Sequence, residues 1–185
     1  MIIIRTYLWP ISCQVNYTTM DWSTNERQVN IIYYFIFENN YFKFRESSFT
    51  SQLFSSVFCG TWNVNAKKHD GSLKEWILPP NHPVSDIYAI GFQEIVDLNA
   101  VNVALNSGNT LQRAQFWREN ISDCLNNSGE IFSFVSEKHL VGLYLCVFVK
   151  ESLFPLVNDV RSTSTGVGIM GLMGNKGAVA IRFRY

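Results

Sequence analysis

Two polar side chains follow apolar runs of the sequence, at positions where they could bind a cation. Asn63 stands near the end of the run 56–64, SVFCGTWNV, and Glu94 ends the run 86–94, DIYAIGFQE. A buried carboxylate is costly unless it is paired or bound to a cation, and Mg²⁺ prefers carboxylate oxygens. An asparagine offers one acceptor and two donors, which suits a ligand or a metal-bound water. Taken singly, each residue could equally be a polar turn or a solvated strand end.

A glycine-rich stretch, residues 165–183, carries a second candidate for ligand binding. Its sequence is TGVGIMGLMGNKGAVAIRF. Glycine lets backbone N–H groups approach a ligand closely, and Lys176 adds a point charge suited to phosphate. Three of the glycines fit G-x-G-x-x-G, but they precede a β-rich run instead of opening a helix. The Walker pattern also fails, because Asn175 separates glycine from lysine. A phosphate loop and a flexible connection both remain open.

The other chemically active side chains favour no site. Asp97 is interpreted as a turn or first-turn residue of a helix and not as a ligand. The three histidines stand apart in the sequence, which favours surface or structural roles for His69, His82 and His139. The four cysteines form no C-x-x-C pair, so reduced thiols are expected.

Composition limits the possible classes of protein. The 185 residues are 47% hydrophobic and have a formal net charge of zero. This excludes a disordered chain and gives no support for a nucleic-acid-binding surface. The N-terminal run has no positive region before it, so it is a poor signal peptide. The apolar run 29–37 is too short for a membrane helix and favours a buried strand.

The elements that must position the candidates alternate between strands and helices. Periodicity predicts helices over 72–78, with a capping box of Ser72 and Glu75, and over Thr110–Leu125. The stretch 141–150 is apolar on both faces, which places it between packed layers. We expect an α/β sandwich. The predicted strands cover 56–64, 86–94, 131–140, 141–150 and 177–185.

The chain divides into two unequal parts. Residues 1–52 are irregular and carry no motif, so they could belong to an upstream domain, add a strand or two, or reflect a doubtful gene start. Residues 53–185 have a regular pattern and contain all the candidate site residues.

Four elements in order identify a family. GTWNVN, DIYAIGFQE, LVGLYLCVFV and GIMGLMGNKGAVAIRF follow one another along the chain. Residues 58–185 resemble the N-terminal part of the catalytic domain of inositol polyphosphate 5-phosphatases, and AIGFQEIVDLNA is similar to the synaptojanin branch. The W-N and Q-E elements also occur in metal-dependent nucleases of the same endonuclease/exonuclease/phosphatase superfamily.

The resemblance implies a fold, a reaction and a set of site residues. The fold would be an incomplete four-layer α/β/β/α sandwich of the DNase I type. The reaction would be Mg²⁺-dependent hydrolysis of the 5-phosphate of a phosphoinositide lipid or a soluble inositol phosphate, with no nucleic-acid partner. Glu94 would be the Mg²⁺ ligand, Asn63 would contact metal-bound water or phosphate, and Asn175 and Lys176 would contact substrate phosphate.

A membrane surface is an expected partner, because the head group of a lipid substrate lies near its acyl chains. The apolar residues of the glycine-rich stretch could enter the membrane beside the site, or fold back onto the sheet. They are Ile169, Met170, Leu172 and Met173. The stretch Leu153–Leu156 could do the same. We therefore expect a cytoplasmic protein that associates peripherally with membranes.

The sequence departs from the family in one respect. It contains neither the G-D-x-N element nor the S-D-H-x-P element of the catalytic step. We therefore expect these 185 residues alone to have little phosphatase activity, and to leave apolar faces uncovered and a sheet edge open. A nuclease of the same superfamily and a truncated non-catalytic product are the alternatives. The neutral charge and the N-K-G-A-V-A-I-R-F run argue against the nuclease.

Overall fold

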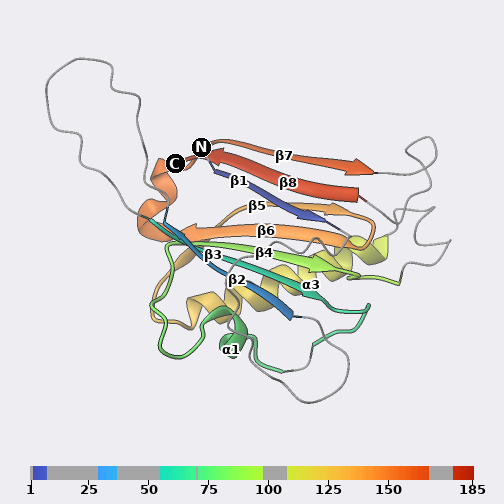
Figure 1. The fold of residues 1–185 in the computed structure, drawn as a ribbon, viewed down its shortest axis with the longest axis horizontal. Coiled ribbons are helices and arrows are strands. Elements are labelled where there is room, and N and C mark those ends of the chain that lie inside the picture. The colour runs from blue at the N-terminus through green and yellow to red at the C-terminus, as the bar shows by residue number, and fades with distance from the viewer. Residues whose placement is uncertain (1, 8–28, 37–54, 70, 98–107, 167–176) are drawn as a thin grey trace, which may run out of the picture.

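The chain folds into two stacked sheets, and the two α-helices among its described residues lie on one side of them (Figure 1). The computed structural model describes residues 2–7, 29–36, 55–69, 71–97, 108–166 and 177–185. Within this part, a five-stranded sheet has the order β2-β3-β4-β6-β5 and a three-stranded sheet the order β1-β8-β7. The expected α/β sandwich is confirmed, and the described residues form three of its four layers.

The bounds of the elements agree with most of the predicted ones. The five-stranded sheet consists of β2 (Val29–Ile36), β3 (Ser56–Asn63), β4 (Ile87–Gln93), β6 (Leu143–Lys150) and β5 (Phe132–Leu140). The three-stranded sheet consists of β1 (Ile2–Tyr7), β8 (Gly177–Arg184) and β7 (Asn158–Gly166). The helices are α1 (Lys74–Ile77), α3 (Gly108–Asn126) and the 3₁₀ helix η1 (Glu151–Leu156).

Strands β3 and β4 are parallel, whereas the other neighbours in the five-stranded sheet are antiparallel. A parallel pair needs a crossover connection, and here the connection contains α1. The register pairs Asn63 with Gln93 at the ends of the two strands. The carboxyl ends of β3 and β4 therefore meet at one edge of the sheet.

Strand β6 lies between two packed layers, as its sequence predicts. On one face Tyr144, Cys146 and Phe148 join a core that includes the inner side of α3. On the other face Leu143, Leu145, Val147 and Val149 pack against buried residues of β8, namely Val179, Ile181 and Phe183. Each face of the five-stranded sheet thus buries a continuous apolar layer.

Helix α3 buries the apolar stripe that its periodicity predicts, with one correction. Ala114, Trp117, Ile121 and Leu125 are buried. Leu111 was expected on this stripe but is 58% exposed. Its place is taken by buried Thr110, because positions 110, 114, 117 and 121 recur at intervals of three and four residues and share one face of the helix.

The predicted capping box of α1 is wrong. The helix begins at Lys74, so Ser72 lies outside the N-cap position and Leu73 occupies it without a side-chain cap. The Ser72 hydroxyl instead accepts a hydrogen bond from the Lys74 N–H at 3.1 Å. The predicted apolar face of α1 is correct, since Leu73 and Ile77 are buried and Trp76 packs against the core.

Two strands of the N-terminal segment join the sheets. Strand β1 pairs with β8, and β2 pairs with β3, which agrees with the interpretation that this segment adds strands. The domain boundary between residues 52 and 53 stays a prediction. The sequence did not predict β7, which completes the three-stranded sheet.

The expectation of uncovered apolar faces is wrong for the described inner face of the five-stranded sheet. Leu145 and Val147 are fully buried because the three-stranded sheet covers them. No helix among the described residues is long and apolar enough to cross a membrane.

Candidate functional site

The structure brings Asn63 and Glu94 together at the carboxyl edge of β3 and β4. The Asn63 Nδ2 donates a hydrogen bond of 2.9 Å to the Glu94 Oε1. Both side chains are half-buried. Within the described part of the chain, this is the one hydrogen bond of the Glu94 carboxylate, which can accept about four. The carboxylate therefore keeps oxygen lone pairs available for a ligand.

Asn63 is fixed by the turn that follows it. Its Oδ1 accepts a hydrogen bond of 3.0 Å from the Asn65 N–H. This bond orients the side-chain amide, so that the Nδ2 points toward Glu94. One asparagine thus links the end of β3 to the carboxylate at the end of β4.

The turn formed by residues 64–68, here called the 64–68 turn, is bonded to β4 through its backbone. The Val64 N–H donates to the Gln93 carbonyl at 3.0 Å, and the Ala66 N–H donates to the Glu94 carbonyl at 2.6 Å. Next along the chain, the Ile95 N–H donates to the Gly142 carbonyl at 3.0 Å. The backbone of Glu94 is therefore held from both sides.

Three non-glycine residues here have left-handed backbone conformations. The φ angles are 47° at Asn65, 55° at Ala66 and 54° at Glu94. Such conformations cost about 1 to 3 kcal/mol each and tend to cluster at functional sites. For an alanine and a glutamate the cost must be offset by the surrounding hydrogen bonds. The three left-handed residues therefore indicate that the backbone at this edge keeps a specific conformation although that conformation lowers its stability.

An aromatic cluster supports the two strand ends from the helix side. Trp62 precedes Asn63, and its ring centroid lies 5.9 Å from that of Trp117 in α3. Phe92, two residues before Glu94, stacks on Trp117 at 4.4 Å. Because these rings are buried, the strand ends have little freedom to move.

The site has the chemistry of a hard-cation site but only part of a ligand set. Carboxylate and amide oxygens suit Mg²⁺ and Ca²⁺. In the part of the chain that the structure describes, no group of three or more His, Cys, Asp or Glu side chains could hold a metal ion. Mg²⁺ is often held by only one or two carboxylates together with waters and substrate phosphates. The Glu94 carboxylate fits such a cation as one ligand.

The glycine-rich candidates lie outside the described residues. Asn175, Lys176 and the four apolar residues Ile169, Met170, Leu172 and Met173 belong to this group. The residue that follows them, Gly177, is described: a Cβ at this position would lie 2.6 Å from the Leu140 side chain. Leu140 precedes the turn whose Gly142 carbonyl binds the Ile95 N–H. Strand β8 thus begins at the same end of the molecule as Glu94 (Figure 1).

The stretch Leu153–Leu156 lies at the other end. It belongs to η1, which follows the last residue of β6, and β6 runs antiparallel to β4. Phe154 and Leu156 are 41% and 44% exposed. The length of the strands separates this stretch from Glu94, so it does not border the site, and its entry into a membrane stays a prediction.

The remaining titratable residues show no second reaction centre among the described residues. His69 packs edge-on against Trp62, with ring centroids 5.1 Å apart, which agrees with a structural role. Asp97 is exposed beyond the bend at residues 95–96. Burial raises the pKa of the Cys59 thiol to about 11 and also raises the pKa of Cys146, so both are protonated at neutral pH.

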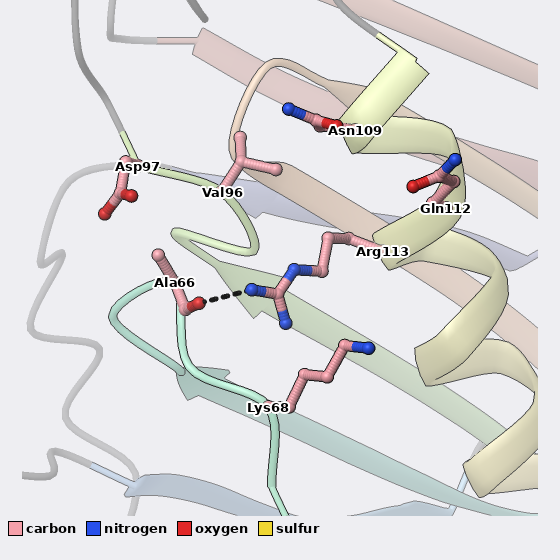
Figure 2. Close-up of a pocket in the computed structure, with 7 residues that line it drawn as sticks. All are labelled: Ala66, Lys68, Val96, Asp97, Asn109, Gln112 and Arg113. Carbon is pink, nitrogen blue, oxygen red and sulfur yellow. Dashed lines mark hydrogen bonds between the residues drawn. The ribbon is translucent and has the colours of Figure 1, made fainter.

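Two contributors to this edge were not predicted from the sequence. The Gln93 side chain donates a hydrogen bond to the Thr61 hydroxyl across β3 and β4. Arg113 of α3 donates to the Ala66 carbonyl (Figure 2). Thr61 could have been found from the parallel register, since it lies two residues before Asn63. Nothing in the local sequence distinguishes Arg113 from the other polar residues of α3.

Fold and site together define a two-sheet α/β protein with a carboxylate–amide pair at a strand-end edge. The model of Endonuclease/Exonuclease/phosphatase family 2 matches residues 60–185. The chain belongs to this family, as its sequence elements predicted.

The curated relatives include inositol phosphatases and synaptojanins by name. The chain is 36% identical over 150 residues to inositol-1,4,5-trisphosphate 5-phosphatase 1 of Schizosaccharomyces pombe, covering 80% of this chain and 14% of the relative. It is 35% identical over 161 residues to type I inositol polyphosphate 5-phosphatase 8 of Arabidopsis thaliana, covering 68% of this chain and 33% of that one. It is 31% identical to human synaptojanin-2, covering 76% of this chain and 10% of that one. The chain therefore spans at most about a third of the length of these three relatives.

A solved structure confirms the fold. The inositol polyphosphate 5-phosphatase domain of SPsynaptojanin, in complex with inositol (1,4)-bisphosphate and calcium ion, aligns with a TM-score of 0.59 at 36% identity. The alignment covers 71% of this chain and 36% of that one. That domain thus binds an inositol phosphate and a divalent cation.

Proposed function

We propose that the protein containing this chain is a Mg²⁺-dependent 5-phosphatase of phosphoinositides or soluble inositol phosphates. The observation that carries the proposal is the Asn63–Glu94 pair, whose carboxylate retains free acceptor capacity at the end of a buried strand. The names of relatives such as the inositol-1,4,5-trisphosphate and phosphatidylinositol 4,5-bisphosphate 5-phosphatases supply the substrate class.

Each site residue has a distinct part in the proposed reaction. Glu94 would hold Mg²⁺, which would supply charge neutralisation to a phosphoryl group during in-line attack by water. Asn63 orients the Glu94 carboxylate through the hydrogen bond of 2.9 Å. Asn175 and Lys176 bind substrate phosphate, since lysine provides a point charge and asparagine a directional donor.

The membrane is the proposed second partner. Ile169, Met170, Leu172 and Met173 enter the lipid surface, which brings the head group to the site from a cytoplasmic, peripherally attached protein. The start of β8 at the Glu94 end of the molecule supports this proposal. Leu153–Leu156 is not part of it, because η1 lies at the opposite end.

The test is phosphate release by the natural full-length protein from inositol 1,4,5-trisphosphate in Mg²⁺. Release that EDTA abolishes, and that Glu94→Gln lowers without unfolding the protein, would support the proposal. Cleavage of plasmid DNA without release of inositol-bound phosphate would replace it with the nuclease alternative.

A further inference from the structure

The 64–68 turn is tied to Glu94 on one side and to helix α3 on the other. The Ala66 N–H donates to the Glu94 carbonyl at 2.6 Å. The Ala66 carbonyl accepts a hydrogen bond of 2.8 Å from the Arg113 Nη2 (Figure 2). Both backbone groups of one left-handed alanine are thus fixed, and they connect Arg113 to the residue that carries the candidate metal ligand.

Among the described residues, the bond to the Ala66 carbonyl is the one hydrogen bond of the Arg113 guanidinium. Its Nη1 is buried and has no hydrogen-bond partner among the described residues. Figure 2 shows the side chain extending from α3 toward the Ala66 carbonyl, away from the helix axis. Hydrogen bonds from a charged donor are stronger than neutral ones. Arg113 thus holds the backbone of Ala66, and this contact is here called the clamp.

Packing holds the ends of the turn more than its middle. Val64 is buried in the core and the Lys68 Nζ lies 5.2 Å from the centroid of the Phe116 ring, whereas Ala66 is half-buried. A cavity of about 300 Å³ adjoins it, lined by Ala66, Lys68, Val96, Asp97, Asn109, Gln112 and Arg113. Beside this cavity Ala66 has fewer van der Waals contacts than a core residue. Its left-handed φ therefore depends on its two backbone hydrogen bonds, one to the Glu94 carbonyl and one from Arg113 of α3.

Helix α3 provides a rigid base for the clamp. Ala114, next in the chain, and Trp117, one turn further on, are buried. Trp117 stacks on Phe92 of β4, two residues before Glu94. The helix that carries Arg113 is thus packed against the strand that carries the carboxylate.

We propose that Arg113 is a positioning residue, which holds the 64–68 turn and through it sets the orientation of Glu94 and Asn63 toward the cation. The consequence for cation binding rests on the proposed function, whereas the effect on the turn does not. Arg113 would act through Ala66 without touching the substrate.

Hydrogen exchange tests the effect on the turn. In Arg113→Met, we expect the Ala66 amide to exchange about tenfold faster, because its bond to Glu94 opens more often. The matched control is Arg118→Met, which removes a guanidinium of the same helix that pairs with Glu137 at 3.1 Å. Equal Ala66 exchange in the two variants would overturn the proposal. Arg113→Gln is the second variant, should the methionine variant fail to fold.

Cation affinity tests the effect on the site. We expect Arg113→Met to raise the Mg²⁺ Kd by about 10- to 100-fold, as other supporting residues of metal sites do. Arg113→Lys should recover part of the affinity, because an ammonium also donates to a carbonyl, whereas Arg118→Met should bind as the wild type does. An unchanged Kd in Arg113→Met would contradict the positioning role. If the wild type binds no Mg²⁺, the proposed function fails, and the exchange of Ala66 still decides the role of Arg113.

Discussion

The two ends of the parallel pair β3–β4 both carry a carboxylate, and the two carboxylates have different surroundings. At the amino end, the Asp86 Oδ2 accepts hydrogen bonds from the Ser56 N–H at 2.8 Å and the Ser56 hydroxyl at 2.9 Å. Its Oδ1 lies 3.3 Å from the Lys150 Nζ. At the carboxyl end, Glu94 has the single amide donor of Asn63 among the described residues.

The difference teaches how to separate a structural carboxylate from a ligand-binding one. Asp86 has a cation and two donors. Glu94 has spare acceptors among the described residues. In the part of the chain that the structure describes, Glu94 has no cationic partner. A half-buried charge without one is costly, so the carboxyl end has a reason to recruit a cation that the amino end lacks.

The largest effect is expected when the carboxylate at the carboxyl end, Glu94, is replaced. In Glu94→Gln we expect kcat on a soluble inositol phosphate to fall roughly 100- to 1,000-fold, because a metal ligand supplies several kcal/mol of charge stabilisation. Steady-state phosphate release at saturating substrate measures it. A urea melt close to that of the wild type is the control. A tenfold loss or less would mean that Glu94 is no metal ligand.

Replacing the carboxylate at the amino end, Asp86, should lower stability and leave activity nearly unchanged. In Asp86→Ala we expect the free energy of unfolding to fall by about 2 kcal/mol, since a charged acceptor of two hydrogen bonds is lost and Lys150 loses the nearer of its two carboxylate partners, Glu130 at 3.6 Å being the other. Urea denaturation measures the change. Activity at a temperature well below the melting point should stay within about twofold. Loss of activity without loss of stability would remove the distinction between the two ends.

The proposed membrane contact should also distinguish the Glu94 end of the molecule from the η1 end. In the double variant Met170→Asp and Met173→Asp, we expect binding to phosphoinositide-containing liposomes to weaken by about tenfold or more, and turnover of a soluble substrate to be unchanged. Phe154→Asp, an exposed apolar residue at the opposite end, is the control and should bind liposomes normally. Equal losses on lipid and soluble substrates would refute membrane insertion.

The smallest effect, on the pH dependence of Tm, is expected at a third carboxylate, Asp159. A hydrogen bond from Arg161, with further help from the charges of Arg161, Arg182 and Arg184, lowers the pKa of Asp159 below its ordinary value of 3.8. A lowered pKa stabilises the folded state above the ordinary value, and this contribution is lost as the pH falls through the folded pKa. Tm should therefore fall less between about pH 5 and pH 3 in Asp159→Asn than in the wild type. Identical slopes would show that these arginines contribute nothing measurable.

The sequence predicted those parts of the fold that have strong hydrophobic periodicity. The strands at 86–94 and 141–150 and the helix at 110–125 were found because each buries at least one apolar face. Strand β7, NDVRSTSTG, was missed because its side chains are almost all polar. It forms because its backbone pairs with β8, whose inner residues supply the apolar contacts.

The same limit applies to the site. Asn63 and Glu94 could be singled out from sequence, because each stands near the end of an apolar run and matches an element of the family. Their pairing depends on the parallel register of β3 and β4, which the structure shows. The contribution of Arg113 depends on where α3 crosses the 64–68 turn, and the left-handed conformation of Ala66 depends on a hydrogen bond to β4. Neither leaves a local pattern, so only the tertiary structure shows them.

A titration with Mg²⁺ tests the central claim, that the Glu94 carboxylate holds a divalent cation at the carboxyl end of β4. Calorimetry on the wild type, Glu94→Gln and Asp86→Asn would compare the two ends of the same strands directly. We expect one Mg²⁺ site in the wild type and in Asp86→Asn, and a Kd at least about tenfold weaker in Glu94→Gln. Binding by Glu94→Gln as tight as that of the wild type would contradict the claim.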